Sequence, residues 1–229
     1  MELIRGISGV RGIVEKSLTE PVIIKHVQAF TEIQSAGDIL LARDSRTHGE
    51  LFIHIAAEAL KKCGRNVIVY NIIPTPTAQF LIEKNNMAGG IVVTASHNPL
   101  EWNGLKFIDR DGCFLDNEKN TKLFEIADSD PTAKNNTGSI LSIENGYLPH
   151  ITHTRGLSVI DTKAIEERNF SIVVDAVNGA ASNALPTMVE ALGCTVFRLF
   201  CDPNGEFPRG AEPLPHNLTS LGEAVRSHN

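Results

Sequence analysis

The sequence alternates short, wholly apolar runs with longer stretches in which apolar residues recur every three or four positions. The short runs have the length and β-branched composition of strands that are buried on both faces. The first longer stretch opens with Thr19-Glu20-Pro21, where a hydroxyl and an early proline are typical of a helix start. Because strand and helix alternate three times, we expect a largely parallel sheet with helices on both faces. The predicted strands are 39–42, 67–70, 91–93 and 106–108, and the predicted helices lie within 19–37, 51–64, 77–83 and 117–127.

A second, shorter series of elements follows residue 145. Residues 128–137 are polar and are typical of a solvated surface loop near the end of the first unit. Asp175 ends a strand of the second unit, where a carboxylate can bind a ligand but more often holds the backbone of the following turn. The sequence therefore predicts an α/β protein with two successive α/β/α three-layer domains, 1–145 and 146–229, with mostly parallel mixed sheets and the second domain incomplete. The elements of the second unit are a linking helix within 147–169, strands at 170–175 and 194–200, and a helix interrupted at Pro186.

The composition restricts the class of protein. At 229 residues, 42% hydrophobic and 21% charged, the chain can bury one large core or two modest ones. A net charge of −6 and the lack of a basic stripe argue against a nucleic-acid partner. No apolar run approaches the length of a membrane span or a signal peptide, so we expect a cytoplasmic protein without a membrane partner. The four cysteines form no Cys-x-x-Cys pair, which argues against disulfides and zinc sites.

The segment with the richest chemistry is 89–108. Its buried strand ends at Ser96 and His97, and Lys106 follows ten residues after the serine. Ligands of α/β sheets collect outside the carboxyl ends of strands, so these side chains are candidates for a common site. The alternative is a polar loop that Asn98-Pro99 merely closes.

Two other loops have open interpretations. The glycines of 6–12 can bring Arg11 close to an anion, or they can serve only as a flexible entry to the first strand. Their spacing does not match the dinucleotide fingerprint. Residues 109–112 contain two aspartates, but they lack the repeated ligands of a calcium loop and favour a hairpin turn.

Several motifs together resemble those of one enzyme family. The hexapeptide 94–99, Thr-Ala-Ser-His-Asn-Pro, followed by Asn-Gly-Leu-Lys at 103–106, resembles the phosphoserine loop of the α-D-phosphohexomutase superfamily. Further resemblances follow the order of that family along the whole chain. They are Gly-Ile-Ser-Gly-Val-Arg-Gly at 6–12, Ala-Arg-Asp-Ser-Arg at 42–46, Pro-Thr-Pro at 74–76, Val-Val-Asp-Ala-Val-Asn-Gly at 173–179 and Glu-Pro-Leu-Pro-His-Asn-Leu at 212–218. Ile7 and Leu41-Ala42 depart from the family pattern and affect only local contacts.

The resemblance implies a mechanism. Phosphorylated Ser96 would give its phosphoryl group to a hexose phosphate, through a hexose 1,6-bisphosphate that also acts as activator, and would supply one oxygen to Mg²⁺. Arg11, Lys106 and Asn103 would bind substrate, with Arg11 on the transferring phosphoryl group. Lys106 would also assist proton transfer, and His97 would support the loop or the substrate. Arg43 and Arg46 either take part or only brace the loop.

The resemblance also sets expectations for the chain as a whole. Members of the family have an Asp-x-Asp-x-Asp-Arg loop for Mg²⁺ and two further domains, and the sequence has no such loop, so we expect an N-terminal fragment that is inactive alone. The favoured activity is that of a phosphoglucomutase/phosphomannomutase. The alternatives are a phosphoglucosamine mutase or, for this fragment, a non-catalytic module that binds sugar phosphate. The sequence predicts no particular oligomeric state.

A serine hydrolase is a further alternative, because Ser96, His97 and Asp109 supply the residue types of a catalytic triad. No Gly-x-Ser-x-Gly elbow surrounds the serine, and the side chains of two neighbours in an extended segment are expected to diverge. The sequence therefore disfavours this reading.

Overall fold

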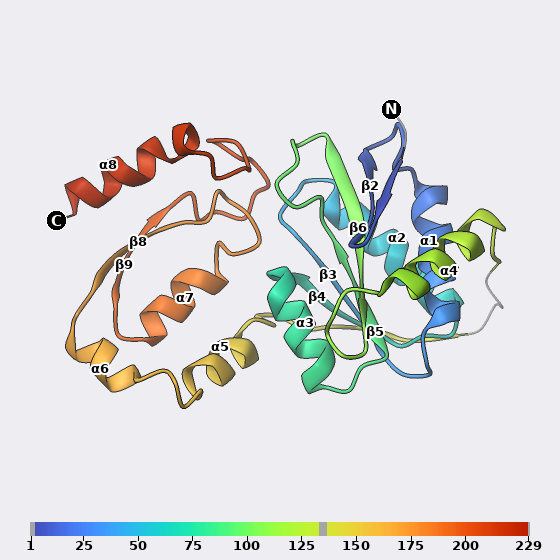
Figure 1. Ribbon diagram of the computed structural model, residues 1–229, viewed down its shortest axis with the longest axis horizontal. Helices are drawn as coiled ribbons and strands as arrows, with labels where there is room; N and C mark the ends of the chain where they lie inside the picture. Colours follow the sequence, from blue (N-terminus) through green and yellow to red (C-terminus); the bar gives the residue numbers. More distant parts are fainter. Residues whose placement is uncertain (1–2, 133–136, 229) are drawn as a thin grey trace.

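The larger part of the molecule is built on one twisted mixed sheet (Figure 1). The computed structural model describes residues 3–132 and 137–228. Within them, the sheet has seven strands in the order β1-β2-β6-β5-β3-β4-β7, of which β5, β3, β4 and β7 run parallel while β6, β2 and β1 are joined antiparallel. The strands are β1 (Ile4–Gly6), β2 (Gly9–Ile13), β3 (Ile39–Arg43), β4 (Val67–Ile72), β5 (Gly89–Val93), β6 (Trp102–Asp109) and β7 (Ile140–Ser142).

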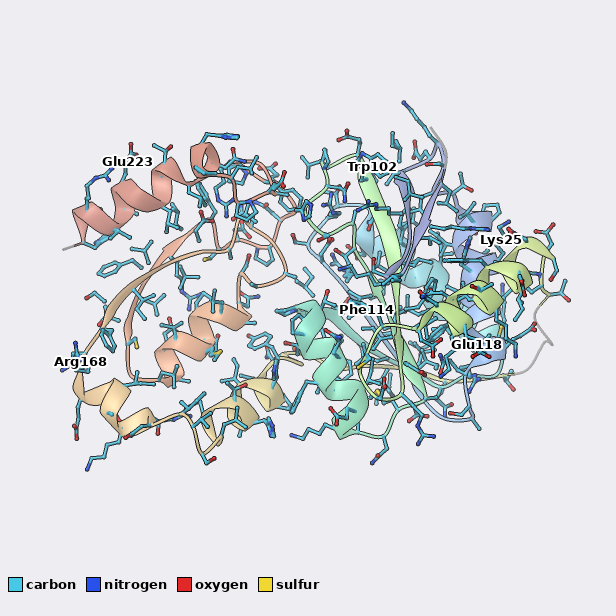
Figure 2. The ribbon with its side chains drawn as sticks, viewed as in Figure 1. Lys25, Trp102, Phe114, Glu118, Arg168 and Glu223 are labelled. Atoms are coloured by element: carbon cyan, nitrogen blue, oxygen red, sulfur yellow. The ribbon has the colours of Figure 1, made fainter. Side chains whose placement is uncertain are left out.

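Helices cover both faces of this sheet, as the apolar spacing predicts, and side chains fill the space between the layers (Figure 2). The helices α1 (Glu20–Ile33), α2 (Gly49–Lys62) and α4 (Asn117–Asp128) share one apolar core with the sheet, in which Phe30 stacks on Phe107 with ring centroids 5.4 Å apart. The opposite face is covered by α3 (Thr75–Lys84), through Leu81 and Ile82. The central strand β3 is buried from both sides because its residues alternate between the two cores. The α/β layered fold is thus confirmed.

The second part of the chain forms a smaller sheet of its own. In it β8 (Ser171–Asp175) pairs in parallel with β9 (Thr195–Leu199), joined by α7 (Ala184–Ala191). The remaining elements are α5 (Leu148–Arg155), α6 (Thr162–Glu167), the 3-10 turn η1 (Pro215–Leu218) and α8 (Thr219–Ser227). The domain boundary near residue 145 falls between β7 and α5 and stays a prediction.

Several local predictions need correction. The glycine-rich start is neither a loop nor a flexible entry but the β1–β2 hairpin. The predicted single linking helix is two short helices, α5 and α6, and the first ends at Arg155, just before Gly156. Pro186 does not interrupt α7, because it lies in the first turn, where its missing N–H costs no hydrogen bond. For the same reason Pro76 lies inside the first turn of α3, which begins earlier than predicted.

Other predictions have simpler outcomes. The turn at 109–112 is confirmed, with the Gly112 amide donating to the Asp109 carbonyl at 3.0 Å. Of the predicted loop 128–137, residues 133–136 lie outside the described part of the chain. All four cysteines are free thiols. Among the described helices, not one combines the length and apolarity that crossing a membrane requires.

Candidate phosphoryl-transfer site

A pocket of about 190 Å³ opens where β5 ends, between that strand and the β1–β2 hairpin. Its wall contains the two cationic side chains Arg11, from β2, and Lys106, from β6. The polypeptide that follows β5 supplies Ser96 and His97. The other lining residues are Ile4, Gly6, Ser8, Gly9, Val10, Thr94 and Ala95. Four of the five predicted site residues are therefore brought together around one cavity.

Ser96 has an unusual backbone conformation. Its φ is +58°, in the left-handed region that non-glycine residues seldom adopt, and its side chain is exposed. This turn brings Ser96 Oγ to 3.4 Å from His97 Nδ1. The prediction that these neighbouring side chains diverge is therefore wrong, because it assumed an extended backbone.

A buried chain of hydrogen bonds fixes the backbone at Ser96. The Ser96 amide donates to Thr94 Oγ1 at 3.0 Å, and the Thr94 hydroxyl donates to Asp44 Oδ2 at 2.6 Å. Asp44 follows β3, and its amide donates to the Val93 carbonyl, which ties the loops after β3 and β5 together. The carboxylate of Asp44 also accepts from the amide and from Nε of Arg46, at 3.0 and 3.1 Å. The position of Ser96 thus depends on residues that lie about fifty positions earlier in the sequence.

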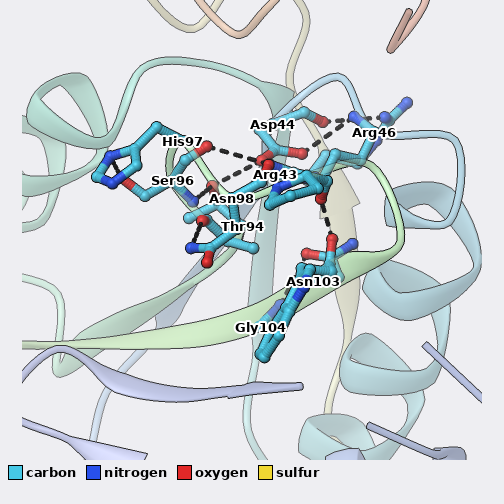
Figure 3. Close-up of polar contacts among 12 residues, drawn as sticks. Arg43, Asp44, Arg46, Thr94, Ser96, His97, Asn98, Asn103 and Gly104 are labelled. Carbon is cyan, nitrogen blue, oxygen red and sulfur yellow. Dashed lines mark hydrogen bonds and ion pairs between the residues drawn. The ribbon is translucent and has the colours of Figure 1, made fainter. Parts of the chain in front are cut away.

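Arg46 holds the rest of the loop (Figure 3). Its guanidinium is fully buried, and besides the contact with Asp44 it donates to four backbone carbonyls between β5 and the start of β6. Every N–H of the guanidinium therefore has an acceptor. Burial lowers the pKa of Arg46, and the attraction of Asp44 opposes that effect. The acceptors are the carbonyls of Ser96 (3.1 Å), Asn98 (2.7 Å), Pro99 (2.7 Å) and Trp102 (3.1 Å). Of the two roles left open for this arginine, the structure shows the bracing one.

The electrostatics of the pocket suit an anion. Burial lowers the pKa of Lys106, Asp44 acts against this lowering, and the neighbouring Arg11 reinforces it. Lys106 Nζ also lies 5.4 Å from the centroid of the Phe114 ring. Two cations in one small pocket repel each other, and a bound phosphoryl group would relieve that repulsion.

Other predicted residues lie elsewhere. Asn103 is fully buried, is not part of the pocket wall, and its Oδ1 accepts from the Gly104 amide at 2.8 Å, which is a structural rather than a substrate contact. Arg43 donates to the Asp44 carbonyl at 3.2 Å and does not reach the loop through any hydrogen bond found among the described residues. Asp109 pairs with Gly89 at the start of β5, whereas Ser96 follows the other end of that strand. The carboxylate of Asp109 also forms an ion pair with Lys119. No Ser-His-Asp triad can form from these three residues.

The pocket by itself does not fit magnesium. A phosphorylated Ser96 would offer one oxygen, but the charged residues that line the cavity are the cations Arg11 and Lys106. Within 3–132 and 137–228, no group of three His, Cys, Asp or Glu residues could hold a metal ion. Mg²⁺ prefers oxygen ligands such as those of carboxylates, so these residues alone do not form a magnesium site.

Sequence reasoning missed Asp44 and Thr94 as parts of the site. Both lie inside the motifs that carry the family resemblance, and this position could have indicated that they belong to the site. Their roles were hidden because each acts by hydrogen bonding to another loop, which no local pattern reveals.

Comparisons with known proteins identify the family of the chain. The family described as phosphoglucomutase/phosphomannomutase, alpha/beta/alpha domain I, matches residues 2–134, and its alpha/beta/alpha domain II matches residues 145–229. The chain is 35% identical to a phosphoglucomutase/phosphomannomutase of Thermococcus kodakarensis and 32% identical to a phosphoglucosamine/phosphogalactosamine mutase of Sulfurisphaera tokodaii, with 97% of this chain and 50% of each relative covered. The chain thus spans about half the length of the curated relatives it matches.

Solved structures show the same relationship. A phosphoglucomutase/phosphomannomutase family protein from Burkholderia thailandensis superposes with a TM-score of 0.76 at 25% identity, over 96% of this chain and 49% of that one. The two family matches together cover nearly the whole sequence. The chain belongs to the phosphoglucomutase/phosphomannomutase family of phosphohexomutases.

Proposed function

We propose that the protein takes part in moving a phosphoryl group between the 1- and 6-positions of a hexose, with Ser96 as the covalent carrier. The observation that carries the proposal is the position of the exposed Ser96 in a pocket whose wall contains the cationic side chains of Arg11 and Lys106. Phosphoryl transfer depends on positioning and on cations that stabilise the charge of the transferring group, and this pocket supplies both.

The phosphoryl transfer would proceed in two half-reactions. In the first, the bond between phosphorus and Ser96 Oγ breaks while a sugar hydroxyl oxygen bonds to phosphorus, giving a bisphosphorylated hexose. The hydroxyl loses its proton to a base, and Ser96 regains a proton. Lys106, whose pKa is lowered by burial, lines the same pocket as Ser96 and can take part in this proton transfer, while Arg11 holds the phosphoryl oxygens. The second half-reaction returns the other phosphate of the intermediate to Ser96.

The favoured substrates are glucose and mannose phosphates. The relative that is 35% identical bears the phosphoglucomutase/phosphomannomutase name. Phosphoglucosamine is the second candidate, because the relative at 32% identity is named for phosphoglucosamine and phosphogalactosamine. Rates measured on a longer form of the protein, with glucose, mannose and glucosamine 1-phosphates under the same conditions, would separate the two.

For the 229-residue chain alone, the proposal is binding of a sugar phosphate without turnover. Its relatives are about twice as long, and positioning donor and acceptor for in-line transfer contributes roughly 7–11 kcal/mol to catalysis. We expect no conversion of glucose 1-phosphate by this chain and conversion by a longer form. Conversion by the 229-residue chain that is abolished in Ser96→Ala would overturn this part of the proposal.

Phosphorylation of Ser96 is the direct test. The longest available form of the protein is incubated with glucose 1,6-bisphosphate, and the modified peptide is mapped by mass spectrometry. We expect one phosphoryl group, on Ser96, and none in Ser96→Ala. Ser8 lines the same pocket, so Ser8→Ala is the matched control and should be labelled normally. Labelling that persists in Ser96→Ala would contradict the assignment.

A further inference from the structure

A segment of the smaller part of the molecule packs against the residues that hold the Ser96 loop. A Cβ placed on Gly205 would lie 2.4 Å from the Ser45 carbonyl oxygen and 3.1 Å from Arg46 Cα. Only a glycine permits this approach, and the φ of Gly205 is +81°, which favours glycine for a second reason. The chain between β9 and α8 is thereby fixed against the turn that follows β3.

Phe207, two residues later, covers the bracing arginine. Arg46 Cζ lies 5.0 Å from the centroid of the Phe207 ring, within the range of a cation–π contact. The segment is anchored in its own unit, since Arg209 Nε donates to Asp175 Oδ2 at 2.5 Å and both side chains are largely buried. Asp175 also accepts from the Val177 amide at 2.9 Å, which confirms its predicted role in the turn.

These contacts form a continuous chain from the smaller sheet to the nucleophile. Asp175 anchors Arg209, the segment carries Phe207, Phe207 covers Arg46, and Arg46 binds the carbonyls of the loop. A guanidinium that water can reach would exchange its bonds to carbonyls for bonds to solvent. The aromatic face prevents this exchange on one side and adds an attraction of its own.

We infer that Phe207 is a positioning residue for the Ser96 loop, residues 94–102, and that it acts through Arg46. The inference rests on the proposed function only in taking Ser96 as the carrier. It makes the geometry at Ser96 dependent on the docking of a segment more than one hundred residues further along the chain.

The test is amide hydrogen exchange in the 229-residue protein. The amides of Ser96, Asn98 and Trp102 are hydrogen-bonded within the loop and report on its opening. We expect Phe207→Leu to increase their exchange rates by about fivefold or more, with no change in β3 or α1. Phe207→Tyr keeps the aromatic face and should restore slow exchange. Phe197→Leu is the matched control, because it removes a phenyl ring of the same unit that stacks on His228 instead of Arg46. It should leave the exchange rates of the loop amides unchanged.

A double-mutant comparison shows whether Phe207 acts through Arg46. In Arg46→Lys the loop should already exchange rapidly, and adding Phe207→Leu should accelerate it little further. Trp102 is the only tryptophan and its carbonyl is one of the acceptors of Arg46, so its fluorescence gives a second readout. If Arg46→Lys fails to fold, the Leu and Tyr variants of Phe207 still decide the matter.

Two results would overturn the inference. One is loop exchange that stays at the wild-type rate in Phe207→Leu. The other is an increase that Phe197→Leu produces equally or that spreads through the whole molecule. Neither readout involves phosphorylation, so a protein that never phosphorylates Ser96 would refute the proposed function, while the exchange rates would still show whether Phe207 holds the Ser96 loop through Arg46.

Discussion

At the scale of single residues, the site depends on side chains and backbone angles in conformations that would be costly elsewhere. Ser96 has a left-handed φ, and Arg46 is a fully buried cation. The sequence identified Ser96 as the candidate nucleophile because it follows an apolar run within a recognisable motif. It could not reveal the left-handed turn or the four carbonyls that Arg46 binds, because backbone acceptors leave no trace in the choice of residues.

The left-handed φ of Ser96 has a measurable cost. Such a conformation costs a residue with a Cβ roughly 1–2 kcal/mol, and glycine largely escapes this cost. We expect Ser96→Gly to be more stable than Ser96→Ala by about 1 kcal/mol in urea unfolding, since both lose the hydroxyl and only one relieves the strain. An alanine variant as stable as the glycine variant would show that the turn carries no strain.

His26 is a second unusual residue, fully buried in α1. Its Nδ1 lies 2.7 Å from the Val22 carbonyl oxygen, while Nε2 is buried without a partner in the described residues. The pKa of His26 is lowered to about 4, chiefly because burial disfavours the charged ring.

The pH dependence of stability follows from this lowered pKa. Between about pH 6.5 and 4 the unfolded chain binds a proton that the folded chain does not. The neutral His26 therefore makes its full contribution to the free energy of unfolding above about pH 6.5. As the pH falls to 4 that contribution is lost, and the free energy of unfolding decreases by roughly 3 kcal/mol. Urea unfolding at several pH values should show a weaker dependence in His26→Gln than in the wild type. The control His54→Gln, at an exposed position of α2, should keep the wild-type dependence.

At the scale of elements, the strands that could be predicted are those whose side chains are apolar on both faces. The sequence predicted β3, β4 and β5 for that reason. It also predicted that Ser96 lies at the carboxyl ends of these strands. The β1–β2 hairpin was missed because its glycines and exposed Arg11 give no strand signal. It is held by pairing with β6, and such a partner distant in sequence is invisible to local periodicity.

Gly104 is a point of close contact between β2 and β6. A Cβ there would lie 2.4 Å from the Val10 carbonyl oxygen and 3.0 Å from that of Thr94. We expect Gly104→Ala to lower the free energy of unfolding by about 2 kcal/mol, because two backbone segments must move. Gly6→Ala is the matched control in β1, where a Cβ would meet nothing within 4 Å, and it should change stability little. Equal effects of the two substitutions would argue against close packing at Gly104.

At the scale of the whole molecule, the two sheets are coupled through a few residues. Besides the segment around Gly205, the linker helix α5 lies against α3, where Thr77 Oγ1 and His150 Nδ1 are 3.0 Å apart and the His150 ring stacks on Phe80. The sequence predicted two units, but it held no signal for how they touch, because the contacts are made by single residues, some in loops and some on the helices α3 and α5.

Gly205 provides the test at this scale. Gly205→Ala and Gly210→Ala place a Cβ at nearly the same positive φ, +81° and +79°, but only Gly205 lies against residues 45–47. We expect Gly205→Ala to be less stable by an additional 1–3 kcal/mol or so, and to make the two units melt separately in calorimetry. Gly210→Ala should still melt in a single transition. Identical melting of the two variants would mean that the units do not depend on this contact.

The cover on Arg46 also has a consequence for synthesis on the ribosome. Arg46, Ser96 and Lys106 all emerge well before Phe207. Translation adds roughly 5–20 residues per second. For several seconds, therefore, Arg46 can bind the loop that carries Ser96 while Phe207 is not yet available to pack on Arg46. During that interval the nascent loop is open to solvent and to proteases, and it reaches its final geometry only when the later segment leaves the tunnel and docks.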